Sequence, residues 1–299
     1  MMTLPGDYYK TLNKMGIKCV PFSKLKRQAN NEFNNRSHRK ILVIDGEIGY
    51  NGGINLADEY INAFEKYGHW KDIGVRIEGE AVNELTRLFL SDYEMNITSE
   101  VEDFTPYLSN KGNTLQDGFV IPFGDGPEPL YKYRISKTMI MTMLNQAKHY
   151  VYMTTPYLII DNELVECIKN AALRGIDVRI ITPHIPDKKL IFLMTRSYYK
   201  ELIDVGVKIY EYTPGFIHAK SYISDDEVAI VGSMNLDYRS LVHHFENGIY
   251  FYHHSVIKWI KEDINKTIDK SILINEKPIK NNLINRLLRE IVYTISPLL

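Results

Sequence analysis

The sequence is poor in several features that mark particular classes of protein. Only two of its 299 residues are cysteine, Cys19 and Cys167, so we expect neither a disulfide framework nor a cysteine-rich zinc site. No apolar run approaches the roughly 18 residues of a membrane-spanning helix, and the longest runs have the length of a strand. The net charge is −1, from 36 basic and 37 acidic residues, which argues against a strongly basic nucleic-acid-binding protein.

What remains is the composition of a globular protein. Hydrophobic residues make up 44% of the chain and charged residues 24%, as in folded domains rather than disordered or collagen-like chains. A chain of 299 residues is long enough for about two domains with a substantial core. Residues 1–10 lack the charged-then-apolar layout of a signal peptide, so we expect a chain that is cytoplasmic or rests on a membrane without crossing it.

Strand and helix patterns alternate along most of the chain, which is typical of βαβ units with a largely parallel sheet covered by helices. The polar stretch 99–117 is the expected linker, and it divides the chain into lobes at 1–110 and 111–299. The basic stretch 24–39 is expected to be a loop, and the tail 283–299 to pack on the core. We expect strands at 16–22, 40–44, 47–51, 73–77, 119–123, 150–154, 175–182 and 206–212, and helices at 81–93, 136–147, 162–174 and 190–205.

One motif occurs twice, with its two copies 180 residues apart. In both copies a lysine follows the histidine by two positions, an aspartate by seven, a glycine by 14 and an asparagine by 17. Such a repeat predicts two similar lobes that face each other across a pseudo-twofold axis. The first copy comprises His38, Lys40, Asp45, Gly52 and Asn55, and the second comprises His218, Lys220, Asp225, Gly232 and Asn235.

The two predicted lobes are unequal in length. The second has a strand–helix–strand block at 150–182 before its Gly206 strand, whereas the first has only about fifteen residues before Gly16. From the repeat we therefore expect the first lobe to be incomplete on its N-terminal side; the alternative is that the two lobes genuinely differ.

Each copy of the motif can aim two functional side chains at one spot, because histidine and lysine two positions apart on a strand project from the same face. A twofold arrangement of the lobes would bring both pairs together with the two motif amides. Two imidazoles, two ammonium groups and two amides around one cavity suit a tetrahedral phosphate. In chain order this set is His38, Lys40, Asn55, His218, Lys220 and Asn235.

These residue types suggest a reaction at phosphorus. Because histidine titrates near neutrality, one ring can be neutral and attack phosphorus to form a covalent phosphohistidine. The other ring can protonate the leaving alcohol oxygen and then deprotonate the incoming alcohol or water. The lysines and asparagines of the set would hold the non-bridging oxygens. No carboxylate or cysteine cluster stands out in the sequence, so we expect neither a metal nor another cofactor.

We expect four carboxylates to belong to the site. A reactive histidine needs its second ring nitrogen held by an acceptor, and we expect Glu246 to hold His218 and Glu59 to hold His38. The remaining two belong to the repeated motif and are expected among its catalytic residues, although each follows an apolar strand and precedes a turn, which favours a structural role. These two are Asp45 and Asp225.

Two histidine pairs lie outside the repeated motif, at 243–244 and 253–254. Neighbouring residues on a strand face opposite ways. We therefore do not expect the members of either pair to bind a metal jointly.

The paired His-x-Lys-x4-Asp motifs resemble the signature of the phospholipase D superfamily, and the segments around them are similar to bacterial cardiolipin synthases. The similarity covers nearly the whole chain. It rests on the segments 34–41 (NNRSHRKI), 52–55 (GGIN), 58–60 (DEY), 70–79 (WKDIGVRIEG), 155–157 (TPY), 216–220 (FIHAK), 232–240 (GSMNLDYRS), 245–246 (FE) and 296–299 (SPLL).

The resemblance implies two phospholipase D-like α/β/α sandwich lobes related by a pseudo-twofold axis, the first lobe incomplete. It implies a phosphatidyltransferase that makes cardiolipin and glycerol from two phosphatidylglycerol molecules, with His38 as nucleophile and His218 as acid/base. The partner is then phosphatidylglycerol in the membrane, without nucleic acid, and the location is the cytoplasmic face of the cell membrane. Family members carry N-terminal membrane helices and a full first lobe, and this sequence departs from both.

Three alternatives stay open. A phospholipase D-type hydrolase would use water in place of the alcohol, and its product would be phosphatidic acid rather than cardiolipin. A nuclease would use the same histidine and lysine pairs on DNA diesters, although the near-neutral charge counts against it. The third alternative is an inactive fragment of the synthase. The sequence does not determine the oligomeric state.

Overall fold

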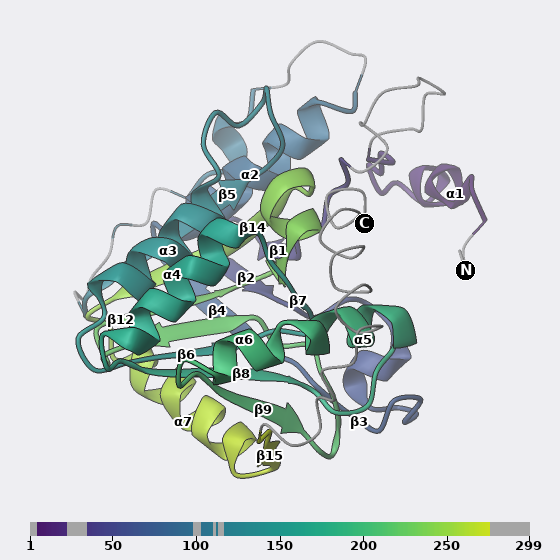
Figure 1. Cartoon of the computed structure of the whole chain (residues 1–299). Coiled ribbons are helices and arrows are strands. Elements are labelled where there is room, and N and C mark those ends of the chain that lie inside the picture. The colour runs from purple at the N-terminus through teal and green to yellow at the C-terminus, as the bar shows by residue number, and fades with distance from the viewer. Residues whose placement is uncertain (1–4, 23–34, 98–102, 110–111, 113–116, 276–299) are drawn as a thin grey trace.

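The computed structural model describes residues 5–22, 35–97, 103–109, 112 and 117–275, and the structural statements below concern these residues (Figure 1). In chain order the elements are α1 (Tyr8–Lys14), β1 (Ile41–Ile44), β2 (Ile48–Gly52), the 3-10 helix η2 (Asp58–Ile61), β3 (His69–Lys71), β4 (Gly74–Glu78), α2 (Val82–Glu94), η3 (Thr105–Tyr107), β5 (Phe119–Asp125), α3 (Ile135–Gln146), β6 (Tyr150–Thr154), β7 (Leu158–Ile159), α4 (Asn162–Leu173), β8 (Asp177–Pro183), α5 (Lys189–Ser197), α6 (Tyr199–Ile203), β9 (Lys208–Tyr212), β10 (Gly215–Ile217), β11 (Ser221–Ser224), β12 (Val228–Gly232), β13 (Leu236–Asp237), the π-helix η4 (Arg239–His243), β14 (Glu246–Tyr252), α7 (Val256–Ile268) and β15 (Ser271–Leu273).

The largest sheet has eight strands in the order β15-β9-β8-β6-β11-β12-β14-β5. Strands β6, β8 and β9 are parallel neighbours joined through helices, and the other neighbours are antiparallel. The sheet is therefore mixed, and the prediction of a largely parallel sheet is wrong. The reason is that the repeated motif forms a hairpin, β11–β12, and a hairpin is antiparallel by construction.

Helices α3, α4, α5 and α6 cover one face of this sheet, and Figure 1 shows α3 and α4 side by side over it. The helices form here because their apolar residues recur at helical spacing. Leu164 and Ile168 of α4 and Leu144 of α3 are fully buried against the sheet residues Ile180 and Ile209.

The opposite face of the large sheet packs against α7, α2 and a three-stranded antiparallel sheet of order β1-β2-β4. Ile77 of β4 and Leu85 of α2 share one core with Ile223, Val231 and Ile249 of the large sheet. The lobes therefore bury their apolar faces against each other, and the predicted α/β architecture is confirmed.

The two lobes are also linked through their backbones. Strand β3 of the first lobe pairs in parallel with β10 of the second, with Trp70 opposite Phe216. At a second place, an isolated bridge joins Ser37 to Phe245. Both links lie directly beside a motif histidine, so they decide what surrounds each ring.

Two predicted elements are wrong, and the other predicted bounds lie within two residues of the observed ones. Residues 16–22 form no strand, because no described strand lies beside them; instead, the Asn13 side chain makes two hydrogen bonds of 2.9 Å with the Cys19 backbone. The helix predicted at 190–205 is divided into α5 and α6 at Tyr198, whose hydroxyl donates to the Ile160 carbonyl at 3.0 Å.

Several expectations concern residues outside the described ranges. These are the tail 283–299, residues 24–34 of the basic loop, and parts of the linker 99–117, including the boundary near residue 110. Among the residues that are described, no helix is long and apolar enough to cross a membrane.

Candidate active site

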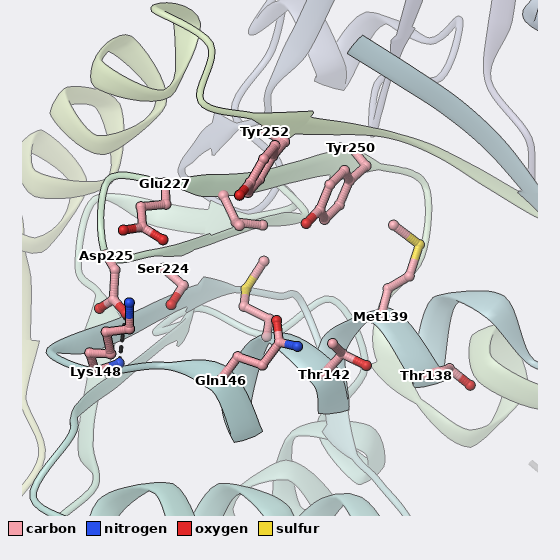
Figure 2. A pocket seen from close by; sticks show the side chains of 12 residues that line it. Thr138, Met139, Thr142, Gln146, Lys148, Ser224, Asp225, Glu227, Tyr250 and Tyr252 are labelled. Atoms are coloured by element: carbon pink, nitrogen blue, oxygen red, sulfur yellow. Dashed lines mark hydrogen bonds between the residues drawn. The ribbon is translucent and has the colours of Figure 1, made fainter. Parts of the chain in front are cut away.

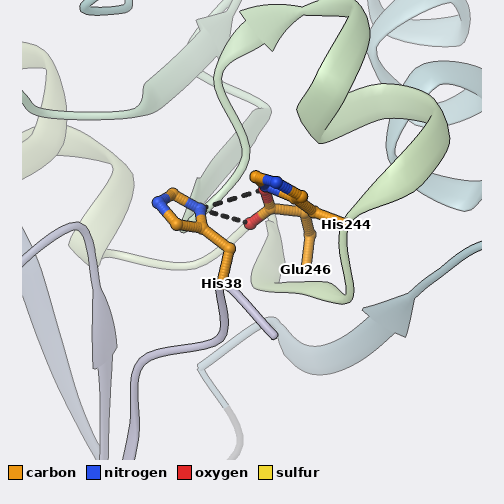
Figure 3. Close-up of side chains that lie close together, drawn as sticks. All are labelled: His38, His244 and Glu246. Atoms are coloured by element: carbon orange, nitrogen blue, oxygen red, sulfur yellow. Dashed lines mark hydrogen bonds and ion pairs between the residues drawn. The ribbon is translucent and has the colours of Figure 1, made fainter. Parts of the chain in front are cut away.

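The first motif histidine is positioned by the bridge between the lobes. The backbone N–H of His38 donates to the Phe245 carbonyl at 2.8 Å, which places the ring beside the next residue, Glu246. His38 Nδ1 lies 3.0 Å from both carboxylate oxygens of Glu246 (Figure 3). Because an ionised carboxylate only accepts, Nδ1 carries the ring proton and Nε2 is left with a free lone pair.

The second motif histidine is positioned in the same way by β3 and β10. The backbone N–H of His218 donates to the Lys71 carbonyl at 2.7 Å, and its Nδ1 lies 2.8 Å from Asp72 Oδ2. The other oxygen of Asp72 accepts from the Ile73 backbone N–H at 2.8 Å, which fixes the carboxylate. His218 therefore also presents Nε2 as its free ring nitrogen.

Aromatic rings surround His218 on several sides. The centroid of its ring lies 5.3 Å from that of Trp70, 5.2 Å from that of Tyr60 and 6.1 Å from that of Phe216. The side chain of His218 is only 8% exposed, against 24% for His38, so the two motif copies are not equivalent.

The predicted carboxylate partners are therefore wrong in both cases. Glu246 holds His38 rather than His218, and Asp72 rather than a glutamate holds His218. Glu59 lies in η2 and is not among the partners of His38. The physical reason is that backbone pairing runs between the lobes, so each histidine meets a carboxylate of the other lobe.

The two motif lysines repeat one local arrangement. Lys40 Nζ donates to the His38 carbonyl at 2.7 Å, and Lys220 Nζ donates in the same way to the His218 carbonyl. Each ammonium group has further N–H donors. Burial lowers the pKa of Lys40 to about 8 and that of the fully buried Lys220 to about 7.

The charges of the two histidine–lysine pairs act on one another across the lobes, as expected for a single site. Burial lowers the pKa of His38, against the opposing effect of Glu246, and the charge of Lys220 in the other lobe lowers it further. Burial lowers the pKa of His218 to about 3, with Lys220 and also Lys40 adding to the effect. In the free protein both rings are therefore neutral near pH 7, as a nucleophile must be.

Glu246 is the most enclosed carboxylate of the site. It is fully buried, it accepts from the Ser233 hydroxyl, and His244 Nδ1 lies 3.5 Å from its Oε1. Burial opposes ionisation, but the interactions with His38 and then His244 hold the pKa of Glu246 well below its usual range. The carboxylate is therefore ionised and able to accept from His38.

The two motif asparagines have local partners. Asn55 Nδ2 donates to the Tyr60 hydroxyl, and Asn235 Nδ2 donates to Asp237 Oδ2 at 2.9 Å. Asn235 Oδ1 is buried without a hydrogen bond among the described residues, so this amide has unused capacity facing the interior.

Two positions near the first motif require glycine, because other atoms approach their backbone too closely for a side chain to fit. A Cβ on Gly52 would lie 2.3 Å from the Ile73 carbonyl oxygen, and one on Gly53 would lie 2.2 Å from Asp72 Oδ1. The Gly-Gly pair therefore lets the first-lobe loop pass directly behind the carboxylate that holds His218.

The motif aspartates lie far from the histidines. Asp45 and Asp225 occupy the turns β1–β2 and β11–β12 with left-handed φ of 53° and 52°. Seven residues of extended chain separate Asp225 from His218, roughly 20 Å. Asp225 accepts from the backbone N–H groups of Lys148, His149 and Tyr150 at 2.7–2.9 Å, which ties its turn to β6. The geometry agrees with a structural role and not with a catalytic one.

Sequence reasoning gave no role to two residues that build the site. Asp72 holds His218, and Arg39 is buried with hydrogen bonds to Asp92 Oδ1 at 2.6 Å, the Tyr131 hydroxyl at 2.6 Å and the Glu246 carbonyl at 3.1 Å. Arg39 thereby anchors the loop that carries His38. The available signal for Asp72 is its place directly before the predicted strand 73–77, in the segment 70–79 that carries the family resemblance.

A separate cavity of about 480 Å³ lies at the opposite end of the large sheet, between α3 and the turn of Asp225 (Figure 2). Thr142 and Gln146 of α3 and Tyr250 of β14 are among its lining residues. None of the motif histidines or lysines lines it, so it is distinct from the candidate active site.

Sequence comparison finds a family model and several proteins that are similar to this chain. A family model described as the PLD-like domain of cardiolipin synthase matches residues 140–268. The chain is 45% identical to an uncharacterised protein of Streptococcus mutans serotype c over all of this chain and 64% of that protein. It is 36% identical to the cardiolipin synthase of Alkalihalophilus pseudofirmus over 99% of this chain and 59% of the synthase. The chain thus spans about three-fifths of the length of these curated relatives.

Structural comparison agrees on the fold. The phosphatidylserine synthase of Haemophilus influenzae Rd KW20 superposes with a TM-score of 0.70 over 98% of this chain and 78% of that one. The sequence identity is 15%, so this likeness shows a shared fold alone.

Proposed function

We propose that the chain is a member of the phospholipase D superfamily that transfers phosphatidyl groups, joining two phosphatidylglycerol molecules into cardiolipin and releasing glycerol. The match of residues 140–268 to the PLD-like domain of cardiolipin synthase and the 36% identity to a cardiolipin synthase support this proposal. The observation that supports this most is the convergence of two histidine–lysine pairs, each histidine held by a carboxylate of the other lobe.

The first half of the proposed reaction forms a covalent intermediate. Nε2 of neutral His38 attacks the phosphorus of one phosphatidylglycerol, and the bond from phosphorus to the headgroup glycerol oxygen breaks. Protonated His218 gives its proton to that oxygen, so that glycerol leaves as a neutral alcohol. His218 is neutral in the free protein, and the negative charge of the bound phosphodiester would favour its protonation.

The second half reverses these roles. His218 removes the proton from the headgroup hydroxyl of a second phosphatidylglycerol, whose oxygen attacks phosphorus and displaces His38. Cardiolipin forms, and both rings return to their starting states. Asp72 and Glu246 keep each Nδ1 protonated throughout, so that Nε2 remains the reactive atom.

Lys40 and Lys220 would bind the non-bridging phosphate oxygens. Lys220 is fully buried and Lys40 is half-buried beside the histidines, where a charge interacts strongly with a developing negative charge. An anion between them would raise their lowered pKa values, so substrate binding and lysine protonation favour each other. The amides of Asn55 and Asn235 are the further donors in this proposal.

A product assay tests the proposal. The protein is incubated with phosphatidylglycerol vesicles, with and without EDTA, and the lipids are measured by mass spectrometry; His38→Ala and His218→Ala are the controls. We expect cardiolipin and glycerol from the wild type in both conditions and from neither variant. Phosphatidic acid instead of cardiolipin would indicate a hydrolase, and cardiolipin from either variant would refute the mechanism.

Trapping the intermediate tests the assignment of the two rings. Rapid acid-free denaturation during turnover, followed by peptide mass spectrometry, should place the phosphatidyl group on the peptide that contains His38. A modified His218 peptide would reverse the assignment.

A further inference from the structure

Beside the nucleophile, three side chains bring metal-binding atoms together. His38, His244 and Glu246 each offer one ligand atom, and these atoms all lie within 4.8 Å of one another (Figure 3). His244 follows the π-helix η4, and its ring lies next to the Glu246 carboxylate, with the centroids of the His38 and His244 rings 5.4 Å apart.

The spacing of these atoms matches a tetrahedral ion. Zinc binds histidine nitrogen and carboxylate oxygen at about 2.0–2.1 Å, so neighbouring ligand atoms of a tetrahedral site lie about 3.3 Å apart. Glu246 lies 3.0 Å from His38 Nδ1 and 3.5 Å from His244 Nδ1, on either side of that value. The two histidine nitrogens lie within 4.8 Å of each other, so an ion could enter once the two rings move closer together.

The chemical state of the cluster also favours a cation. Glu246 is a fully buried carboxylate, and His244 Nδ1 is buried and makes no hydrogen bond among the described residues. Two imidazoles and one carboxylate form a donor set that binds zinc with a fourth position open to water.

We propose that His38, His244 and Glu246 form a binding site for zinc or a similar transition-metal ion, and that the bound ion inhibits the enzyme. Magnesium and calcium are poor candidates, because they prefer oxygen ligands and higher coordination numbers. The binding part stands on the geometry alone, whereas the inhibition part rests on the proposed function.

Inhibition follows from the position of one proton. A metal bonded to His38 Nδ1 displaces the proton that this atom donates to Glu246. A neutral ring with a metallated Nδ1 carries its proton on Nε2, so the lone pair that would attack phosphorus is no longer available. The ion therefore does not need to cover the phosphate site in order to stop the reaction.

Metal binding is measured first, without reference to activity. The chelator-stripped protein is titrated with Zn²⁺ by calorimetry and with Co²⁺ by visible absorption, where four-coordinate cobalt gives an intense signal. The variants are His244→Ala and His244→Gln, which keeps a polar group next to Glu246, and the control is His149→Ala, which removes an exposed histidine. Circular dichroism verifies that each variant is folded.

We expect one ion per chain in the wild type and the control, and affinity reduced at least tenfold in both His244 variants, since even the loss of an outer partner costs a metal site about 10–100-fold. Absence of binding by the wild type, or equal binding by a folded His244 variant, would overturn the proposal. Should His244→Ala fail to fold, His244→Gln decides.

The phosphatidylglycerol assay then tests inhibition. Zinc should lower wild-type turnover at least tenfold, EDTA should restore it, and His244→Gln should keep most of its own zinc-free rate. A wild type that binds zinc with unchanged turnover would refute the inhibition. A wild type that binds zinc but makes no cardiolipin without it would refute the proposed function and leave the metal site standing.

Discussion

Replacing Asp72 by asparagine should disable His218 without removing a single heavy atom from the site. The carboxylate uses one oxygen for His218 Nδ1 at 2.8 Å and the other for the Ile73 N–H at 2.8 Å. An amide has only one oxygen for these two donors. If that oxygen stays with Ile73, the amide NH₂ faces His218 and forces the ring proton onto Nε2.

The magnitude follows from comparing the two amide orientations. If the amide oxygen turns towards His218, the amide NH₂ faces the backbone N–H of Ile73. These two buried donors then lack an acceptor, which costs about 1–3 kcal/mol. The orientation with the wrong His218 tautomer is then favoured about 5–150-fold. The amide also lacks the charge that stabilises a protonated ring. In serine protease triads the same replacement costs about 10⁴ in kcat, and we expect Asp72→Asn to lose a similar factor, equivalent to about 5.5 kcal/mol.

Two measurements on Asp72→Asn test this reasoning. Turnover of phosphatidylglycerol gives kcat, and long-range nitrogen NMR of the histidine rings shows which nitrogen of His218 is protonated. The control is Asp204→Asn, which removes an exposed carboxylate paired with Lys200 on the surface. A folded Asp72→Asn protein with kcat within tenfold of wild type, or with His218 still protonated on Nδ1, would refute the role of Asp72.

Three further predictions follow. The pKa of Lys220 is about 7 in the folded protein and 10.5 as a free side chain, so between these values the unfolded chain binds more protons than the folded one. The free energy of unfolding therefore rises with pH, by up to about 1.4 kcal/mol per pH unit. Lys220→Met should flatten this rise in urea melts between about pH 8 and 10, and an unchanged slope would contradict the lowered pKa. Arg39→Ala should lower the free energy of unfolding by about 3–5 kcal/mol, because Asp92 loses its buried partner at 2.6 Å; a loss below about 1 kcal/mol in urea titration would argue against a buried pair. Gly53→Ala should reduce turnover of a folded protein at least tenfold, because the added Cβ displaces Asp72 from His218; wild-type kcat with an unchanged melting temperature would show that this contact is not critical.

The local parts of the fold could be predicted from the sequence. The spacing of apolar residues predicts the bounds of both α2 and α4 to within one residue, because burial of one face decides whether a helix forms. The repeated motif likewise indicated which histidines and lysines share a site. These features depend on residues close in sequence or on an internal copy of the same pattern.

The non-local parts could not be predicted in this way. Residues 16–22 have the composition of a strand, but a strand needs a neighbour, and hydropathy does not say whether one is present. The exchange of carboxylates has the same origin. Nothing in the sequence near His218 indicates that its partner is Asp72, the residue after β3 and 146 positions earlier.

The exchange of carboxylates between the lobes also means that each motif histidine and its partner are synthesised at different times. His38 and Glu246 are 208 positions apart, so at about 5–20 residues per second roughly 10–40 s of translation separate them. During that interval the nascent chain displays a motif histidine whose ring proton has no acceptor to fix it. The proposed reaction therefore requires that both lobes have been synthesised and have docked, because His38 has its carboxylate partner only then.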